Sequence, residues 1–456
     1  MIFILTKKEI LEDIYNIRFI ILVLLCSILI PLTLFINQKA LDRDIIDYYQ
    51  TLTKYEEKLK SGSHNTLTFE ASGFRPPSEL RIFSIGLDTT LPSSIIITRD
   101  EGIKSGENKA EDSPYHAFLG KIDFLFIIKV VMSLVAMIFT FNAISGEKEQ
   151  GTIRQILSNS IHRYKIVIAK YLGNFIILLF PFILGLTLGL LIVITSSDTQ
   201  LLSSNHLLRI IFMFLIALIY ISLFLNLGLF ISVITKRSWT SIVFLLFIWV
   251  IFVHVIPQIS GMIAETLYPV KSVRVLNIEK DIQKKSIEKE QSKELQEIFM
   301  KNNYDELRKP IVEKYKKILA ERLRNIDQEH KNRKRVQRII ANTISRTSPS
   351  SSLTFIFSEL SNTGILEMEN FITSALQFQN LIEANVYADT YTDDVGSGMS
   401  VKLGAGDFSN IPRFNYRKVE FVKSILSIQL DLFLLILFNA LLFSLSAFLF
   451  ITYDVR

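Results

Sequence analysis

Six long apolar runs are the feature that most constrains what this chain can fold into. A helix needs about 20 mainly apolar residues to cross the hydrocarbon core of a bilayer, and it satisfies its own backbone hydrogen bonds there. The chain has 456 residues, of which 49% are hydrophobic. The runs predict an α-helical integral membrane protein with six transmembrane helices, and they lie approximately at 18–37, 123–145, 168–195, 207–234, 239–257 and 427–452.

The distribution of Lys and Arg predicts how these helices are oriented. With six spans, the two long polar stretches and the short loop 195–206, which has no Lys or Arg, fall on one side. The termini, the loop at 146–167 and the turn at 235–238 fall on the other. Orientation follows the Lys and Arg of short loops, whereas long domains cross largely regardless of their charge. We therefore expect a multi-pass protein of the cytoplasmic (inner) membrane with both termini cytoplasmic. The basic residues on the expected cytoplasmic side are Lys7, Lys8, Arg18, Lys148, Arg154, Arg163, Lys165, Lys170, Lys236, Arg237 and Arg456.

The spans divide the chain into five parts. Residues 1–37 hold an interfacial helix, expected at 4–18 from its apolar spacing, and a first span too long for the apolar region of a signal peptide. Residues 38–122 form the first extracytoplasmic insertion, and 123–257 hold the second to fifth spans with a cytoplasmic loop at 146–167. Residues 258–426 form the second insertion, and 427–456 hold the last span and the cytoplasmic C-terminus. We expect the two insertions to pack as one mixed, mainly helical domain.

Local patterns give finer expectations for the insertions. The first insertion predicts a helix at 42–60 and strands at 80–87 and 93–100. In the second, residues 272–346 predict two long charged helices interrupted at Pro310, followed by a shorter helical return to about 382. The Gly-rich stretch 391–414 predicts loop or irregular strand.

Residues 271–346 also concentrate the positive charge of the chain. They contain 21 basic and 12 acidic residues, against a net charge of +6 for the whole chain. A solvated helix face explains such a surplus. Attraction to anionic lipid headgroups or to an acidic extracytoplasmic protein partner is the functional alternative. A nucleic-acid partner is not expected.

The chain lacks the signatures of common enzymes. It has no phosphate-binding loop, no His-Glu-x-x-His and no Gly-x-Ser-x-Gly motif. Its single cysteine, Cys26, forms no disulfide within the chain, and the six histidines lack metal-ligand spacing. We therefore expect no catalytic, cofactor or metal site in this chain. The pair Gly185 and Gly189 predicts a close helix contact, either structural or at a dimer seam.

The loop at 146–167 carries a dense polar pattern between two apolar runs. Gly151 and Thr152 predict a turn and a helix cap. Ile153, Ile156 and Leu157 then follow at helical spacing, with Arg154 facing away. A plain turn needs only about four residues. We therefore predict a short amphipathic helix that lies along the membrane face and offers a surface to a partner.

The sequence GEKEQGTIRQILSNSIHRYKIVIAKYLG (146–173) resembles the cytoplasmic loop of ABC-2 type permeases, the membrane subunits of a class of ABC transporters. Three further stretches agree in order: IPQISGMIAETLYPVKS, SPSSSLTFIFSELSNTGI and the C-terminal stretch from IPRFNYRK to FLFITYDVR. Together they resemble the branch with large extracytoplasmic insertions, similar to gliding-motility and nitrous-oxide-reductase maturation permeases. The resemblance covers residues 123–456. Ser160 departs from it, since many members have Pro there.

The resemblance implies a permease subunit that couples ATP hydrolysis by a separate ABC ATP-binding subunit to export of a substrate. ATP and Mg²⁺ would be bound by that partner, and a second permease subunit, identical or a related paralogue, would complete the transporter in contact with membrane lipids. One alternative is mechanotransmission, in which motion passes to an extracytoplasmic partner and no substrate moves. Another is a receptor or scaffold without an ATPase. The implied ATPase-coupling residues are Glu147, Lys148, Glu149, Gln150, Gly151, Thr152 and Arg154, with Arg163 and Lys165 as secondary contacts.

Overall fold

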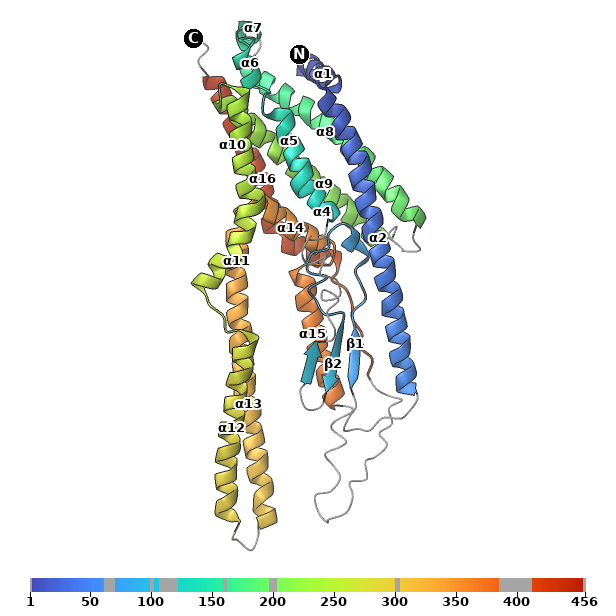
Figure 1. The fold of residues 1–456 in the computed structure, drawn as a ribbon, viewed down its shortest axis with the longest axis vertical. Helices are drawn as coiled ribbons and strands as arrows, with labels where there is room; N and C mark the ends of the chain where they lie inside the picture. Colours follow the sequence, from blue (N-terminus) through green and yellow to red (C-terminus); the bar gives the residue numbers. More distant parts are fainter. Residues whose placement is uncertain are drawn as a thin grey trace. The chain divides into compact units, whose positions relative to one another are not determined.

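The computed structural model describes residues 2–60, 70–98, 102–105, 122–158, 162–196, 203–299, 304–384 and 412–453. These residues form two compact units. Unit 1 comprises Met1–Val253 and Pro349–Arg456, and unit 2 comprises His254–Ser348. Figure 1 shows the ribbon with both units.

Six helices are long and apolar enough to cross a membrane, which confirms the predicted number of spans. Each of them extends beyond the apolar run that predicted it, because the same helix continues into flanking polar sequence. Their bounds are Ile17–Leu59, Phe124–Glu149, Arg163–Ser196, Ser204–Ile234, Ser238–Leu267 and Phe421–Thr452.

The spans contain several labelled helical segments. Two of them include a short π-helix, where a wider turn replaces the α-helical one. The segments are α2 (Ile17–Lys60), α4 (Phe124–Phe126), the π-helix η3 (Ile127–Met132), α5 (Ser133–Thr140), α6 (Ser145–Glu149), α8 (Arg163–Ser196), α9 (Ser204–Ile234), α10 (Ser238–Val250), the π-helix η4 (Ile251–Val255), α11 (Ile256–Leu267) and α16 (Phe421–Thr452).

The N-terminal helix predicted at 4–18 is present as α1 (Ile2–Ile14). It ends at Ile14, and the Asn16 Oδ1 atom accepts a hydrogen bond from the Arg18 amide (3.1 Å), which caps the start of α2. Helix α2 then runs for 44 residues. The helix predicted at 42–60 is therefore confirmed, and it continues the first span without a break.

Helix α9 lies at the centre of the membrane core and includes the fully buried side chains of Tyr220 and Phe224. Helices α2 and α8 approach closely at the glycine pair named above. A Cβ atom on Gly185 would lie 2.5 Å from the Cys26 carbonyl oxygen, and one on Gly189 would lie 2.7 Å from Leu34 Cδ1. This glycine pair therefore packs against α2 of the same chain.

A small sheet lies at the end of unit 1 opposite α1 (Figure 1). Strands β1 (Ala71–Phe74), β2 (Ser94–Thr98) and β3 (Gly102–Ser105) pair antiparallel in that order, with Ala71 opposite Ile97 and Ile97 opposite Ile103. The strand predicted at 93–100 is thus confirmed. The strand predicted at 80–87 is wrong: η1 (Glu79–Ile82), a 3₁₀ turn, occupies its first half.

Helix α15 (Ile365–Ile382) packs on this sheet, and Phe371, Ala375 and Phe378 share a core with Ile95 and Ile97. The preceding helix is α14 (Pro349–Leu360). The helical return predicted in this region is split in two, because Asn362 adopts a positive φ of 53°. The Glu359 Oε1 atom then accepts hydrogen bonds from the amides of Ile365 and Leu366 and so caps α15.

Unit 2 consists of α11, α12 (Val273–Ile298) and α13 (Tyr304–Ser345), of which α12 and α13 pack against each other. The two long helices predicted here are confirmed. Their predicted boundary is wrong, because α12 ends at Ile298 and Pro310 lies inside α13. The Gly-rich stretch predicted as loop lies almost wholly outside the described residues.

Candidate functional site

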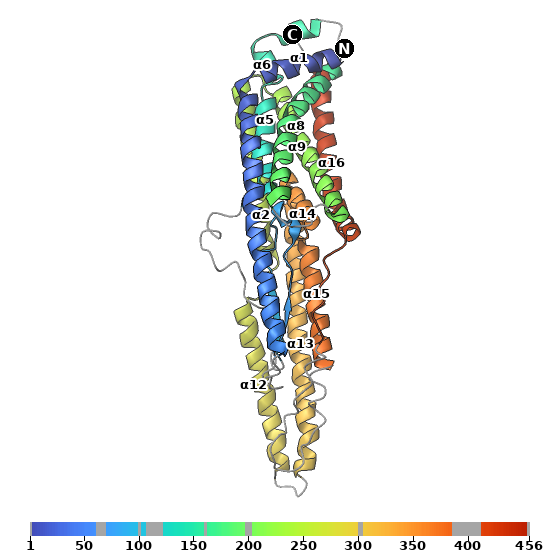
Figure 2. The ribbon, with the colours of Figure 1, turned by 90° about the vertical axis from the view of Figure 1, so that its right-hand side faces the viewer.

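The polar loop 146–167 folds into two short helices at the α1 end of unit 1 (Figure 2). Helix α6 is followed by Gly151, whose φ of +74° is readily adopted by glycine, and then by α7 (Ile153–Ser158). Ile153 is buried in an apolar cluster with Ile144, Val233 and Phe450. The short helix predicted after Thr152 is therefore present, and Ile153 anchors it to the helix bundle. Residues 159–161, with Ser160, lie outside the described residues.

Lys170 forms the central contact beneath this loop. Its Nζ atom lies 2.7 Å from Glu147 Oε1 on α6 and 3.1 Å from Glu9 Oε1 on α1. The Lys170 side chain is 5% exposed, and each carboxylate is 18% exposed. A buried ammonium group is tolerated only where carboxylates and hydrogen bonds compensate its lost hydration. The three residues therefore form a charged joint, defined here as Glu9, Glu147 and Lys170, that links α1, α6 and α8.

Close backbone packing reinforces this charged joint. A Cβ atom on Gly173 would lie 2.8 Å from the Cβ of Glu9, so α1 rests directly on α8 at this point. Asp13, one turn further along α1, has its pKa raised to about 6, first by burial and then by the negative charge of Glu9. Figure 2 shows α1 at the same end of unit 1 as α6.

Two basic residues of the predicted site cap the ends of other helices. The Lys148 ammonium donates to the carbonyls of Val233 and Thr235 at the end of α9 and lies 4.5 Å from the centre of the Tyr453 ring. The Arg163 guanidinium donates to the carbonyls of Ile451 (2.8 Å) and Tyr453 (2.6 Å) at the end of α16. Cations are favoured at helix C-termini, where the last carbonyls are unpaired.

Glu149 binds the start of a third helix. Its Oε2 atom accepts a hydrogen bond from the Ser238 amide (3.0 Å), the first residue of α10. Carboxylates are favoured at helix N-termini for the same electrostatic reason that cations are favoured at the other end. The loop is therefore attached to α1, α8, α9, α10 and α16. The side chains that attach it are ones that the sequence analysis predicts to form a single charged surface.

The remaining residues of the predicted site are arranged differently. Gln150, Gly151 and Arg154 are exposed. The Thr152 hydroxyl donates to the Glu147 carbonyl (3.4 Å) and so turns back towards α6. The Lys165 ammonium lies 5.9 Å from the centre of the Tyr164 ring at the start of α8. Glu149 is exposed as well, but it binds the start of α10, so we place it with the residues that hold the loop to the bundle. The other exposed residues form an outward group, which we call the loop tip and define as Gln150, Gly151 and Arg154.

Sequence reasoning missed Lys170 and Glu9 as members of this site. The distribution of charge in the sequence indicates only that Lys170 belongs to the basic residues that set orientation. Its position inside an apolar run was the available signal, since an ionisable residue there needs a partner. Glu9 gave no signal of its own, because its pairing depends on how α1 folds back onto α8.

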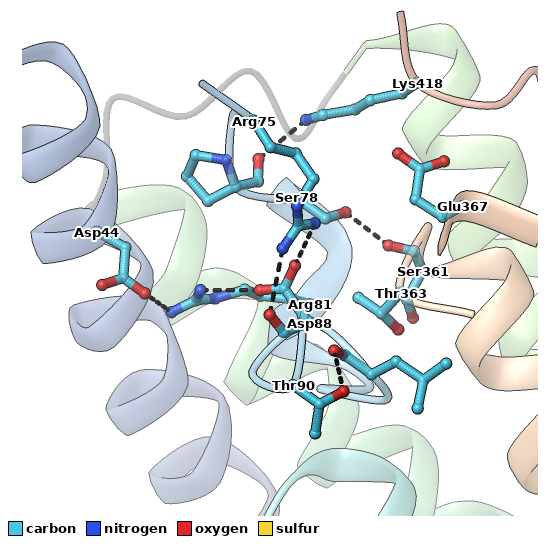
Figure 3. Close-up of polar contacts among 12 residues, drawn as sticks. Asp44, Arg75, Ser78, Arg81, Asp88, Thr90, Ser361, Thr363, Glu367 and Lys418 are labelled. Atoms are coloured by element: carbon cyan, nitrogen blue, oxygen red, sulfur yellow. Dashed lines mark hydrogen bonds and ion pairs between the residues drawn. The ribbon is translucent and has the colours of Figure 1, made fainter. Parts of the chain in front are cut away.

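A second charged cluster lies near the sheet (Figure 3). Asp88, whose side chain is 3% exposed, accepts from Arg75 Nη1 (2.8 Å) and Arg81 Nη1 (3.0 Å), and Arg81 also pairs with Asp44 of α2. A cavity of about 380 Å³ adjoins it, lined by residues that include Tyr48, Phe74 and Ile96. These ion pairs attach the sheet region to α2.

Nearby hydrogen bonds connect this cluster to the later part of the chain. The Ser78 hydroxyl donates to the Ser361 carbonyl (2.6 Å), and the Lys418 ammonium donates to the Pro77 carbonyl (3.0 Å) (Figure 3). The Thr363 hydroxyl donates to the Ser84 carbonyl (3.0 Å). Segments from both polar stretches of the sequence therefore meet at this end of unit 1.

Comparison with known proteins gives one positive finding. The profile of a family described as ABC-2 family transporter protein matches residues 3–452, which is almost the whole chain. No curated protein matches the chain at a significant level.

Proposed function

Because the chain belongs to the ABC-2 family of transporter proteins, we propose that it exports a substrate across the cytoplasmic membrane with energy from a separate ATP-binding subunit. Membership of this family makes the chain a multi-pass membrane permease subunit that is not itself catalytic, and it implies an ATP-binding partner in the transporter. In our proposal the partner binds ATP and Mg²⁺, and two permease subunits, identical or paralogous, enclose the pathway. Both termini and the loop 146–167 face the cytoplasm.

The observation that carries the coupling role is the charged joint. A docked ATPase would contact the exposed loop tip, whereas Glu147 connects the same loop to Lys170 and, through it, to Glu9. Buried ion pairs with two or more partners hold a fixed geometry, because breaking one leaves an uncompensated charge. A displacement of α6 would therefore move α1 and α8 together.

Docking is tested by making the loop tip acidic. The double substitution Gln150→Glu and Arg154→Glu changes two exposed side chains and leaves the charged joint intact. We expect the purified full-length chain to lose co-purification with its ATPase. Lys54→Glu, an exposed substitution on α2 near the opposite end of unit 1, is the control and should retain binding. Retained binding in the double variant would refute docking at the loop tip.

Mechanotransmission is a second candidate function, and the separate unit 2 favours it. Residues 254–348 form a compact unit of their own whose long helices carry mostly polar surfaces. Deletion of 280–340 discriminates between the two functions in proteoliposomes. If the chain exports a substrate through its spans, efflux persists in the deletion variant. If unit 2 passes motion to an extracytoplasmic partner, the partner's response is lost while ATP hydrolysis continues.

A further inference from the structure

The charge of unit 2 is unevenly distributed along its helices. We define its basal half as residues 256–282 and 331–346, and its distal half as residues 283–330. The basal half contains nine Lys and Arg against three Asp and Glu, whereas the distal half contains twelve against ten. The basal half therefore carries a surplus of six positive charges, against a surplus of two in the distal half.

Contacts within unit 2 place this charge beside the end of the fifth span. That span ends at Leu267, and the next residue, Tyr268, accepts a hydrogen bond through its carbonyl from Gln337 Nε2 of α13 (3.0 Å). The exposed residues Lys331, Lys334 and Arg335 lie within two turns of Gln337 on the same helix. The basic cluster of α13 is therefore level with the point where the fifth span ends.

The basal half also exposes large apolar side chains. On α11, Met262 is 66% exposed and Leu267 is 65% exposed. On α12, Ile278 is 52% exposed and Ile282 is 60% exposed. A surface that combines exposed apolar side chains with an excess of Lys and Arg is typical of segments that lie at a membrane interface. A purely solvated helix face would not require the apolar part.

The length of the fifth span supports the same placement. Its 30 residues correspond to about 45 Å of helix, which is about the thickness of a bilayer including both headgroup regions. Trp239, 74% exposed, lies near the start of this span, and Tyr268 directly follows its end. Trp and Tyr are enriched at the two membrane interfaces. The residues that follow Leu267 are therefore at headgroup level.

We infer that the basal half of unit 2 is a docking surface for the anionic phospholipid headgroups of the leaflet that Leu267 reaches. The basic side chains bind the lipid phosphates, while Met262 and Leu267 at the end of the span contact the apolar boundary beneath them. An acidic protein would match the charge. It would not explain why the charge coincides with exposed apolar residues at the end of a membrane span.

A local fluorescence measurement tests this inference without the ATPase. The single cysteine, Cys26, is replaced by Ser, and a bimane label is attached at Ile278→Cys or, as a distal control, at Ser292→Cys. The full-length chain is reconstituted into liposomes that contain a headgroup-attached quencher. We expect label 278 to be quenched about two-fold more strongly in equimolar phosphatidylglycerol and phosphatidylcholine than in phosphatidylcholine alone. Label 292 should be equally bright in both.

Charge variants then identify the residues responsible. Lys331→Glu, Lys334→Glu and Arg335→Glu together should abolish the phosphatidylglycerol-dependent quenching at position 278. The matched control carries Lys284→Glu, Lys285→Glu and Lys289→Glu, three exposed residues of the distal half, and should retain it. Quenching at 278 that ignores the lipid charge, or that both triple variants lose equally, would overturn the proposal. Loss in the basal triple variant alone supports it.

Discussion

The ammonium of Lys170 lies 2.7 Å from the carboxylate of Glu147, so a loop residue expected to face a partner protein instead binds a buried cation of the next span. This relationship joins the loop to α8, and Glu9 joins both to α1.

We predict that Lys170→Met uncouples the transporter while the ATPase still binds. The substitution leaves Glu147 and Glu9 without their shared cation, and breaking a buried pair in this way destabilises a protein by about 3 kcal/mol. ATPase co-purification should persist, while substrate-stimulated ATP hydrolysis and efflux fall. The exchange Glu147→Lys with Lys170→Glu should restore less than the wild type, because Glu9 then faces a second carboxylate. Full activity of Lys170→Met would contradict a coupling role for the joint.

We predict that Gly185→Ala lowers the thermal stability of the detergent-solubilised chain. The new methyl group would lie 2.5 Å from a backbone carbonyl of α2, which cannot move aside without separating α2 from α8. Gly261→Ala on α11 is the matched control, because a Cβ atom there has no neighbour within 4 Å. Its effect should be neutral or stabilising by up to about 1 kcal/mol. Equal melting temperatures for the two variants would contradict the close approach of α2 and α8.

We predict that Asp88→Asn loosens the sheet end of unit 1. The substitution removes the charge that binds Arg75 and Arg81 together, and breaking a buried ion pair of this kind costs about 3 kcal/mol. Hydrogen exchange should rise in β1, β2 and η1 and stay unchanged in α8. Glu56→Gln is the control, since its pair with Arg413 is 3.8 Å long and largely exposed. Unchanged exchange in β1 of Asp88→Asn would argue against the cluster as a structural link.

We predict that Asp13 of α1 contributes more to the stability of the folded chain at pH 5 than at pH 7.5. The pKa of Asp13 is raised in the folded chain to about 6, so the folded state binds this proton more tightly than the unfolded state. The resulting stabilisation is fully present below the ordinary pKa and is lost as the pH rises through about 6. Asp13→Asn should remove this part of the pH dependence. The difference between the melting temperatures of the two chains, measured at both pH values, checks it.

Much of the membrane fold was predictable, because the length and hydropathy of a segment determine whether it can cross a bilayer as a helix that satisfies its own backbone hydrogen bonds. The six spans, the helix before Asn16 and the two long helices of unit 2 all follow from such local patterns. The continuous α2 was missed because nothing in 38–41 marks either a break or its absence. The strand predicted at 80–87 failed because its apolar residues contact the helix bundle, and burial there outweighs β-propensity.

The candidate site was predictable in location and less so in detail. The density of charge in 146–167 marked the loop, and the spacing of Ile153 and Ile156 marked its helix. The direction of each charge was not visible, since Lys148, Arg163 and Glu149 bind helix ends that come from distant parts of the chain. Only the tertiary arrangement decides which charges point inward. Their role in ATPase binding remains a prediction.

The length of α2 has a consequence for unit 1. Its 44 residues correspond to a rod about 66 Å long. Helix α1 lies next to one end of α2, and Glu9 of α1 forms an ion pair with Lys170. Towards the other end of α2, Asp44 forms an ion pair with Arg81 of the sheet region. One continuous helix therefore links the region where α1 meets α8 to the sheet region, and Pro31 is the position in it where a bend is expected.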